Sequence, residues 1–377
     1  GEHLPAYFRG ARLVVTSPGI PVGVLVLLLA ESDGAALMAE LELALRYVQE
    51  PILAVTGTSG KTTTVSLAAA MLKEAGKRVF LGGNIGTPHS RYVLGGAGAD
   101  VLVLELSSFQ LQAPGSLRPH VAMLLNLSEN HLDHHKDMAE YAEAKFRIFA
   151  GQSGDDLAVL PPELLAAYEQ GGFGARVAVF RPGGRFNSMR LLGRHNAANA
   201  EAAYLAVREF GVTEAQAVRA ADAFAPLRHR LESAGTVNGV LYVNDSKSTT
   251  VDALRAALSS FESPVILLAG GKFKGGDLES PCELVVDLGK AAVFLLSMRQ
   301  IFRHAWEGGG PLACAPGTVR AGARTGGMAG EGDVVLLSPA TSSYDLYANY
   351  KERGNHFCRL VEDARMGAVF STPEKQA

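Results

Sequence analysis

The sequence predicts a multi-domain α/β protein with a central P-loop ATPase domain, a C-terminal Rossmann-like α/β domain and an incomplete N-terminal domain. Three observations support this. Apolar, strand-like runs alternate with helical patterns, which is typical of parallel sheets covered by helices on both faces. A glycine-rich turn of the phosphate-binding type follows one of these runs. A second alternating series begins near residue 240, and 377 residues are enough for two or three domains.

The elements follow in order along the chain. A strand-like run at 12–16 precedes a helical pattern that ends near Tyr47. After the run that starts at 52, we predict strands at 78–81, 101–106 and 121–127, and helices at 62–75, 138–149 and 196–211. Gly76 is a plausible helix stop. The pattern blurs between 151 and 193, where glycine and proline are dense. It resumes with strands near 240 and at 265–269, 292–297 and 334–338. The predicted domains are 1–50, 51–226 and 227–377.

Composition narrows the functional classes. Hydrophobic residues make up 47% and charged residues 19%, as in a globular protein. The net charge is −3 without a basic cluster, so we expect no nucleic-acid partner. The apolar run at 22–30 is too short to cross a membrane, and no leader is recognisable, so we expect no membrane association. The few unpaired cysteines suit the cytoplasm. A monomer is the default expectation.

The segment 52–63, I-L-A-V-T-G-T-S-G-K-T-T, predicts nucleoside-triphosphate binding. Gly57 and Gly60 let backbone N–H groups approach phosphate oxygens, Lys61 would reach the β- and γ-phosphates, and Thr62 would bind Mg²⁺. The first glycine of the general P-loop pattern is absent, because Val55 occupies its position. A chance glycine turn is the alternative.

Two further polar clusters follow strand-like runs. Glu105 ends the run at 101–106 and could complete a Mg²⁺ site beside Thr62, or be a solvated acid. The segment 126–135, N-L-S-E-N-H-L-D-H-H, could be a metal site or simply a polar loop. Thiolates and closed ligand spacing are absent, which favours Mg²⁺ over Zn²⁺.

Eight motifs in sequence order resemble the Mur ligases across about 13–362. They are G-T-S-G-K-T-T, E-L-S-S-F-Q-L, L-N-L-S-E-N-H-L-D, Y-A-E-A-K-F-R-I-F, G-R-H-N-A-A-N-A, L-R-H-R-L-E, N-D-S-K-S-T and S-P-A-T-S-S-Y-D-L-Y-A-N-Y-K-E-R-G-N-H-F. The second and last point to the member that adds D-glutamate. Another Mur-type or folylpolyglutamate-type ligase, or a non-catalytic P-loop protein, is the alternative.

The resemblance implies an ATP-dependent amide ligase of peptidoglycan synthesis, acting on UDP-N-acetylmuramoyl-L-alanine, D-glutamate and ATP through an acyl phosphate. It implies two Mg²⁺ ions and a carbamate on Lys145. Catalytic roles would fall to Lys61, Lys145, His131 and Arg230. Metal binding would involve Thr62, Glu105, His131 and Lys145. ATP would contact Gly57, Thr58, Ser59, Gly60, Lys61, Thr62, Thr63, Asn196, Asn199, Arg230, Asp245 and Lys247.

The substrate-binding residues implied by the resemblance come from all three domains. They are Ser17, Pro18, Gly19, Asn84, Ser107, Lys247, Thr249, Lys274, Ser343, Tyr344 and Tyr350. The chain departs from the family pattern at two places. It lacks the glycine-rich turn that receives the UDP group, and Asn130 stands where an acid is frequent. We also expect a hinge near 225–230 that closes on the bound substrates.

Overall fold

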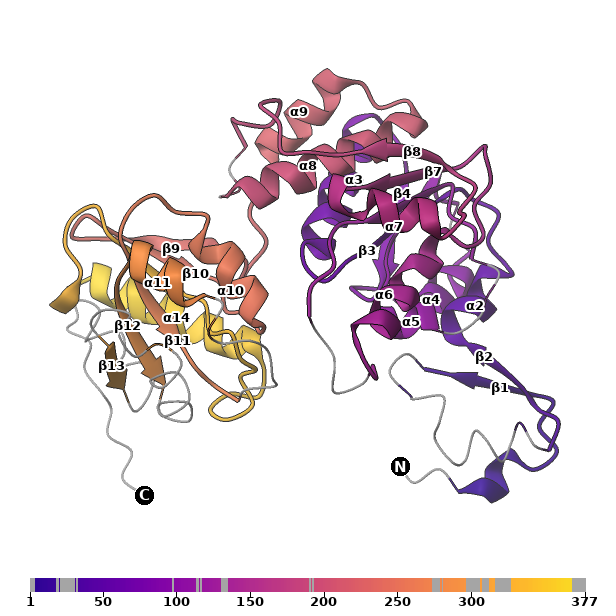
Figure 1. The fold of residues 1–377 in the computed structure, drawn as a ribbon, viewed down its shortest axis with the longest axis horizontal. Helices are drawn as coiled ribbons and strands as arrows, with labels where there is room; N and C mark the ends of the chain where they lie inside the picture. The colour runs from indigo at the N-terminus through magenta and orange to yellow at the C-terminus, as the bar shows by residue number, and fades with distance from the viewer. Residues whose placement is uncertain are drawn as a thin grey trace. The chain divides into compact units, whose positions relative to one another are not determined.

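The computed structural model describes residues 4–17, 20, 31, 33–96, 98–112, 115, 117–129, 135–189, 191, 193–272, 279, 281–295, 306, 312–315 and 327–367. The chain forms two compact units (Figure 1). The first comprises Gly1–Leu127, His134–Met189 and Ala197–Phe224, and the second comprises Ser128–Asp133, Arg190–Asn196 and Ala225–Ala377. The α/β class predicted from the sequence is confirmed in both.

The first unit is built on a six-stranded sheet in the order β4-β5-β3-β6-β7-β8, with all strands parallel. The strands are β3 (Ile52–Thr56), β4 (Val79–Gly83), β5 (Val101–Glu105), β6 (Val121–Leu124), β7 (Leu157–Leu160) and β8 (Arg176–Val179). β3, β5, β6 and β7 are buried along their whole length, as expected of central parallel strands. The first four strands were predicted, whereas β7 and β8 fall in the stretch where the sequence pattern blurred.

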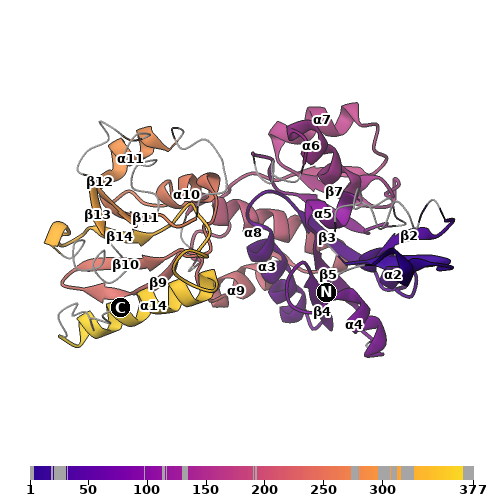
Figure 2. The ribbon, with the colours of Figure 1, turned by 90° about the horizontal axis from the view of Figure 1, so that it is seen from below.

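Helices cover both faces of this sheet. In Figure 2, α6 (Met138–Phe146) and α7 (Leu165–Gln170) lie on one face, and α3 (Lys61–Glu74) and α9 (Glu214–Ala223) on the other. The shorter elements are α4 (His89–Leu94), α5 (Ser108–Gln112), η2 (Arg147–Phe149) and η3 (Pro162–Leu164), and α8 (Arg194–Val207) runs into η4 (Arg208–Phe210). α3 ends as predicted, with Gly76 at φ +78° two residues after its last residue.

The second unit has a six-stranded sheet in the order β13-β12-β11-β14-β10-β9. Its strands are β9 (Glu232–Val237), β10 (Val240–Asn244), β11 (Val265–Ala269), β12 (Gly289–Leu295), β13 (Leu312–Ala315) and β14 (Val334–Leu337). Only β9 is antiparallel to its neighbour. Figure 2 shows α10 (Val251–Leu258) and α11 (Cys282–Leu288) on one face and α14 (Tyr350–Arg365) on the other. The carboxyl ends of β10, β11 and β14 therefore meet at one edge.

The N-terminal segment contains η1 (Pro5–Phe8) and a two-stranded parallel sheet of β1 (Leu13–Thr16) and β2 (Ala36–Ala39). β1 matches the predicted run at 12–16, and β2 was not predicted. α2 (Glu40–Leu45) ends two residues before Tyr47. No helix among the described residues is long and apolar enough to cross a membrane. The three-domain division stays a prediction.

Candidate active site

The loop between β3 and α3 has the shape of a phosphate cradle. Gly57 has φ +150° and Gly60, which immediately precedes α3, has φ +83°. A Cβ atom on Gly60 would lie 2.6 Å from Asn199 Oδ1. The backbone angle therefore favours glycine at position 60, and a Cβ there would also force the Asn199 side chain to shift. The N-terminus of α3 follows directly, which favours a bound anion.

A side chain that follows the neighbouring strand of the sheet holds this loop in place. Asn126, just after β6, accepts a hydrogen bond from Ser59 N at 2.8 Å and donates one to Ser59 O at 3.1 Å. Its backbone oxygen accepts a hydrogen bond from Thr58 N at 3.1 Å. The loop is thus fixed from outside as well as by its own glycines.

Lys61 folds back over the loop that precedes it. Its Nζ atom donates hydrogen bonds to Gly57 O at 2.7 Å and to Thr58 O at 2.9 Å. The ammonium group therefore lies on the inner side of the cradle, where a phosphate would need a positive charge.

Thr62 and Glu105 supply two oxygen atoms that converge. Thr62 Oγ1 donates to Glu105 Oε2 at 2.8 Å, and Asn84 Nδ2 donates to Glu105 Oε1 at 2.8 Å. Glu105 is buried at the end of β5, and a Cβ on Gly83 would lie 2.3 Å from its backbone oxygen. A hydroxyl and a carboxylate form the all-oxygen set that Mg²⁺ prefers, so these residues fit the ion. Within the described ranges, no group of three His, Cys, Asp or Glu side chains gathers as a metal cluster.

Lys145 brings a second amine to the same loop from the other direction. It lies on α6 with 1% of its surface exposed, and its Nζ atom donates to Gly57 O at 2.9 Å. The Tyr141 ring, one helical turn earlier, lies 4.7 Å from Nζ, and the Tyr141 hydroxyl is 3.2 Å from Thr58 Oγ1. Burial, with a contribution from the nearby charge of Lys61, lowers the pKa of Lys145 well below its usual value, although Glu105 opposes the shift. Lysines on helices are usually solvated, and Lys145 is an exception.

The last residue of the polar segment 126–135, His135, has a structural role. His135 is buried, and its Nε2 atom lies 2.9 Å from Ser108 Oγ, while its ring stacks on Phe109. His135 thereby joins α5 to the loop before α6. Asn130 and His131, the predicted metal ligand, lie outside the described residues, as do Pro18, Gly19 and Lys274. The roles predicted for them stay predictions.

The remaining candidates of the first unit have the following surroundings. Thr63 is buried in the first turn of α3, and Asn199 lies against Gly60. Ser107 is engaged with Gln110, since its N and Oγ atoms donate to Gln110 Oε1 at 3.0 and 3.1 Å. Asn84 is exposed but bonded to Glu105, and Ser17 is exposed at the end of β1.

In the second unit, the nucleotide-binding candidates cluster after β10. Asp245 is buried, and its carboxylate accepts from Leu231 N at 3.2 Å and Ser338 Oγ at 3.1 Å. Desolvation raises the pKa of Asp245 to about 7. Lys247 Nζ lies 4.4 Å from the centre of the Tyr350 ring.

The other candidates of this unit lie at the surface or just beneath it. Ser343 is buried, Tyr344 is exposed, and Arg230 and Thr249 are half-buried; Asn196 is buried near the start of α8. No described contact assigns a ligand to any of them.

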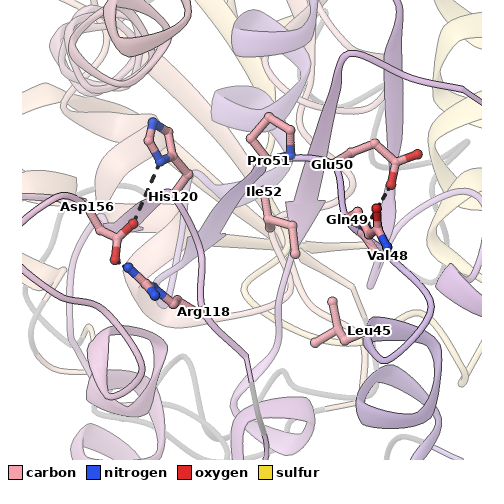
Figure 3. Close-up of a pocket in the computed structure, with 9 residues that line it drawn as sticks. All are labelled: Leu45, Val48, Gln49, Glu50, Pro51, Ile52, Arg118, His120 and Asp156. Carbon is pink, nitrogen blue, oxygen red and sulfur yellow. Dashed lines mark hydrogen bonds and ion pairs between the residues drawn. The ribbon is translucent and has the colours of Figure 1, made fainter.

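A shallow concavity of about 350 Å³ opens at the other end of the first sheet (Figure 3). Ile52, His120 and Asp156 mark the starts of β3, β6 and β7 in its wall. Arg118 Nε donates to Asp156 Oδ2 at 3.0 Å within its lining. None of the predicted site residues lines this concavity.

Comparison with known proteins connects this geometry to a family. The model of the Mur ligase middle domain matches residues 55–168, which include the cradle, Glu105 and Lys145. The UDP-N-acetylmuramoylalanine--D-glutamate ligase of Oleidesulfovibrio alaskensis is 57% identical over 96% of this chain and 82% of its own length. The chain belongs to the Mur ligase family. The enzyme of the same name from Nitratidesulfovibrio vulgaris is 53% identical over 96% of this chain and 84% of its own length.

Solved structures of a Mur ligase and of a folylpolyglutamate synthase have the same fold. The MurF ligase of Thermotoga maritima in complex with ADP aligns with 94% of this chain and 98% of its own, at a TM-score of 0.64 and 18% identity. The folylpolyglutamate synthase of Mycobacterium tuberculosis, complexed with ADP and AMPPCP, gives a TM-score of 0.62 over 84% of this chain and 92% of its own at 13% identity. At these identities the likeness concerns the fold alone. The sequence prediction of a Mur-type ligase is confirmed at the level of the family.

Sequence reasoning gave no role to two residues that shape the Mur ligase cradle. Tyr141 contacts both Lys145 and Thr58, and Asn126 brackets Ser59. Asn126 lies near the end of the strand predicted at 121–127, and Tyr141 precedes Lys145 by one helical turn. Strand-end position and helical spacing were the available signals.

Proposed function

We propose that this protein is an ATP-dependent amide ligase that joins D-glutamate to UDP-N-acetylmuramoyl-L-alanine in peptidoglycan-precursor synthesis. The observation that carries the proposal is the convergence of Lys61, Thr62, Glu105 and Lys145 on one phosphate cradle. The names of relatives that are 53–57% identical support the substrates.

The reaction has two steps. A carboxylate oxygen of the muramoyl substrate attacks the γ-phosphorus of ATP, and ADP leaves. The amine of D-glutamate then attacks the acyl-phosphate carbonyl, loses a proton, and inorganic phosphate leaves. Both steps bring anions together, so the site must supply positive charge and exclude water.

The residues of the cradle meet the first requirement. Lys61 and the amides at the start of α3 hold the triphosphate, and Asn126 keeps the loop in shape. Thr62 and Glu105 would hold one Mg²⁺, which supplies Lewis-acid stabilisation of phosphate charge when bound. His131 and Lys145 would hold the second ion. Asn84, which donates a hydrogen bond to Glu105, is proposed to contact the muramoyl substrate.

Lys145 also fits the carbamate that the family resemblance implies. Carbamate formation needs a neutral amine, and burial favours the neutral form of Lys145. The modified side chain would present an anionic oxygen pair to a metal ion. From the second unit, Arg230, Asp245 and Lys247 are proposed to contact ATP. Thr249 would complete the wall of the site with Lys247, and Lys274 and Ser343 are proposed to bind D-glutamate. A monomer in the cytoplasm is the accompanying prediction.

Phosphate release from ATP tests the proposal. The protein is assayed with UDP-N-acetylmuramoyl-L-alanine and with D-glutamate, L-glutamate, or no amino acid. We expect release only with both the muramoyl substrate and D-glutamate. Release that ignores both substrates would leave an ATPase, and release driven by a folate would favour the folylpolyglutamate-type alternative.

A further inference from the structure

Arg353 is the most deeply buried cation of the second unit among the described residues, with 1% of its surface exposed. It lies in the first turn of α14, which is capped by the Asn349 side chain at Glu352 N, 3.0 Å away. A buried arginine is rare unless its charge is paired or its donors are satisfied. Its partners therefore indicate what the residue does.

The guanidinium group links the loops that follow two neighbouring strands. Nε donates to Ser246 Oγ and Nη2 donates to Ser246 O, both at 2.9 Å, just after β10. Nη2 also donates to Thr341 O at 3.1 Å, after β14. Ser246 Oγ in turn donates to Tyr350 O at 2.9 Å, which closes the link back to α14.

A third loop packs against the same group. A Cβ on Gly271, which follows β11, would lie 3.2 Å from Arg353 Nη1 and 2.5 Å from Thr341 Oγ1. Lys272 and Ser342 exchange two backbone hydrogen bonds, at 2.9 and 3.0 Å, that join this loop to the one after β14. The ends of β10, β11 and β14 are thus held around a single guanidinium, and Lys247, Thr249 and Ser343 belong to the loops so held.

Among the described residues, no carboxylate pairs directly with the positive charge at this point. Arg353 Nη1 and Thr341 Oγ1 are buried without a hydrogen-bond partner, and Arg353 forms no ion pair within the described part of the chain. Desolvation lowers the pKa of Arg353 to about 10, so the group stays protonated at neutral pH. Asp345 acts on it only through space. A buried cation that has no directly paired carboxylate among the described residues creates a field at this strand-end edge that attracts an anion.

We propose that Arg353 is a positioning residue that sets the preference for an acidic amino-acid substrate. Its three-way link orients the loops that carry Ser343, Lys247 and Thr249, and its unpaired charge favours a substrate carboxylate over a neutral amide. The side chain is sealed from solvent, so it acts through these loops and through its field, and does not touch the substrate. This inference rests on the proposed function.

Two variants separate the effect of the hydrogen bonds that link the loops from the effect of the positive charge of Arg353. Arg353→Lys keeps the charge but loses the planar fork that reaches both loops. We expect it to raise KM for D-glutamate by about tenfold, with KM for ATP within about twofold of wild type and the preference for D-glutamate over D-glutamine retained. Arg353→Met removes the charge together with the hydrogen bonds. We expect it to raise KM for D-glutamate and also to lower the preference for D-glutamate over D-glutamine by about tenfold. Arg365→Lys, at an exposed position near the end of α14, is the matched control and should change neither.

Ser246→Ala provides a second test in case the Arg353 variants fold poorly. It removes the acceptor of Nε and the donor to Tyr350 O, but keeps the Arg353 side chain and its bonds to Ser246 O and Thr341 O. It should raise KM for D-glutamate in the same direction by a smaller factor. Thermal unfolding is followed for every variant. If KM for D-glutamate and the D-glutamate preference stay at wild-type values while stability drops, Arg353 is only a structural residue and the inference is wrong. If wild-type protein shows no D-glutamate-dependent phosphate release, the proposed function fails instead.

Discussion

Lys145 Nζ donates a hydrogen bond to the carbonyl oxygen of Gly57 at 2.9 Å, and so the phosphate loop and the buried amine hold each other in place. A carbamate nitrogen keeps one N–H group, which means that this contact can survive the proposed modification. The cradle and the modified side chain would then be positioned by the same hydrogen bond. A change in either is expected to disturb both.

The first prediction concerns carbon dioxide. Carbamate formation uses the neutral amine, and removal of CO₂ should therefore lower the ligase rate of the wild type, with bicarbonate restoring it. Lys145→Met should lose about 100-fold or more in rate and should not respond to bicarbonate. The exposed Lys77→Met is the control. ¹³C NMR after exposure to ¹³C-labelled bicarbonate reads the carbamate directly, and its absence from an active enzyme would remove this part of the mechanism.

Gly60 and Gly76 provide a matched pair of glycines with positive φ. Gly60→Ala places a Cβ 2.6 Å from Asn199 Oδ1, whereas the space beside Gly76 is open. Both variants should lose about 1–2 kcal/mol of unfolding free energy from the backbone angle. Only Gly60→Ala should also abolish ATP binding, measured by calorimetry. Equal ATP affinities for the two variants would show that position 60 does not shape the cradle.

Glu105→Gln tests the proposed magnesium site. The change keeps the size of the side chain but replaces a carboxylate oxygen with an amide, which is a weaker ligand for Mg²⁺. We expect the Mg²⁺ concentration for half-maximal rate to rise by about tenfold or more. Glu163→Gln, at an exposed position in η3, should follow the wild-type Mg²⁺ titration. Coinciding titrations for all three proteins would place the ion elsewhere.

Asp245 predicts a pH dependence of stability. Burial raises its folded pKa to about 7, above the 3.8 of a solvent-exposed aspartate, so folding takes up a proton between these values. The free energy of unfolding should therefore fall as pH rises through this window, by about 1.4 kcal/mol per pH unit at most, and level off above about 7. Asp245→Asn should remove this slope. Urea unfolding from pH 5 to 8.5 checks it, and parallel profiles for the two proteins would contradict it.

Local sequence signals were enough for much of this molecule. The strands β3, β5 and β6 are continuous apolar runs, and the cradle follows one of them, so that pattern and position agreed. β7 and β8 were missed because glycine and proline surround them, and β13 because its four residues carry little periodicity. The contact of Tyr141 with Thr58 joins residues 83 positions apart, and only the folded sheet brings them together.

The concavity in Figure 3 lies at the amino ends of β3, β6 and β7, whereas the phosphate cradle lies at the carboxyl end of β3. A compound seated between Leu45 and Arg118 would leave Lys61 and Thr62 open to nucleotide. In an inhibitor screen, such a compound would be recognised by a potency that does not weaken as the ATP concentration is raised. Competition with ATP thus distinguishes compounds that bind the concavity at the amino ends of the strands from compounds that bind the phosphate cradle at the carboxyl end.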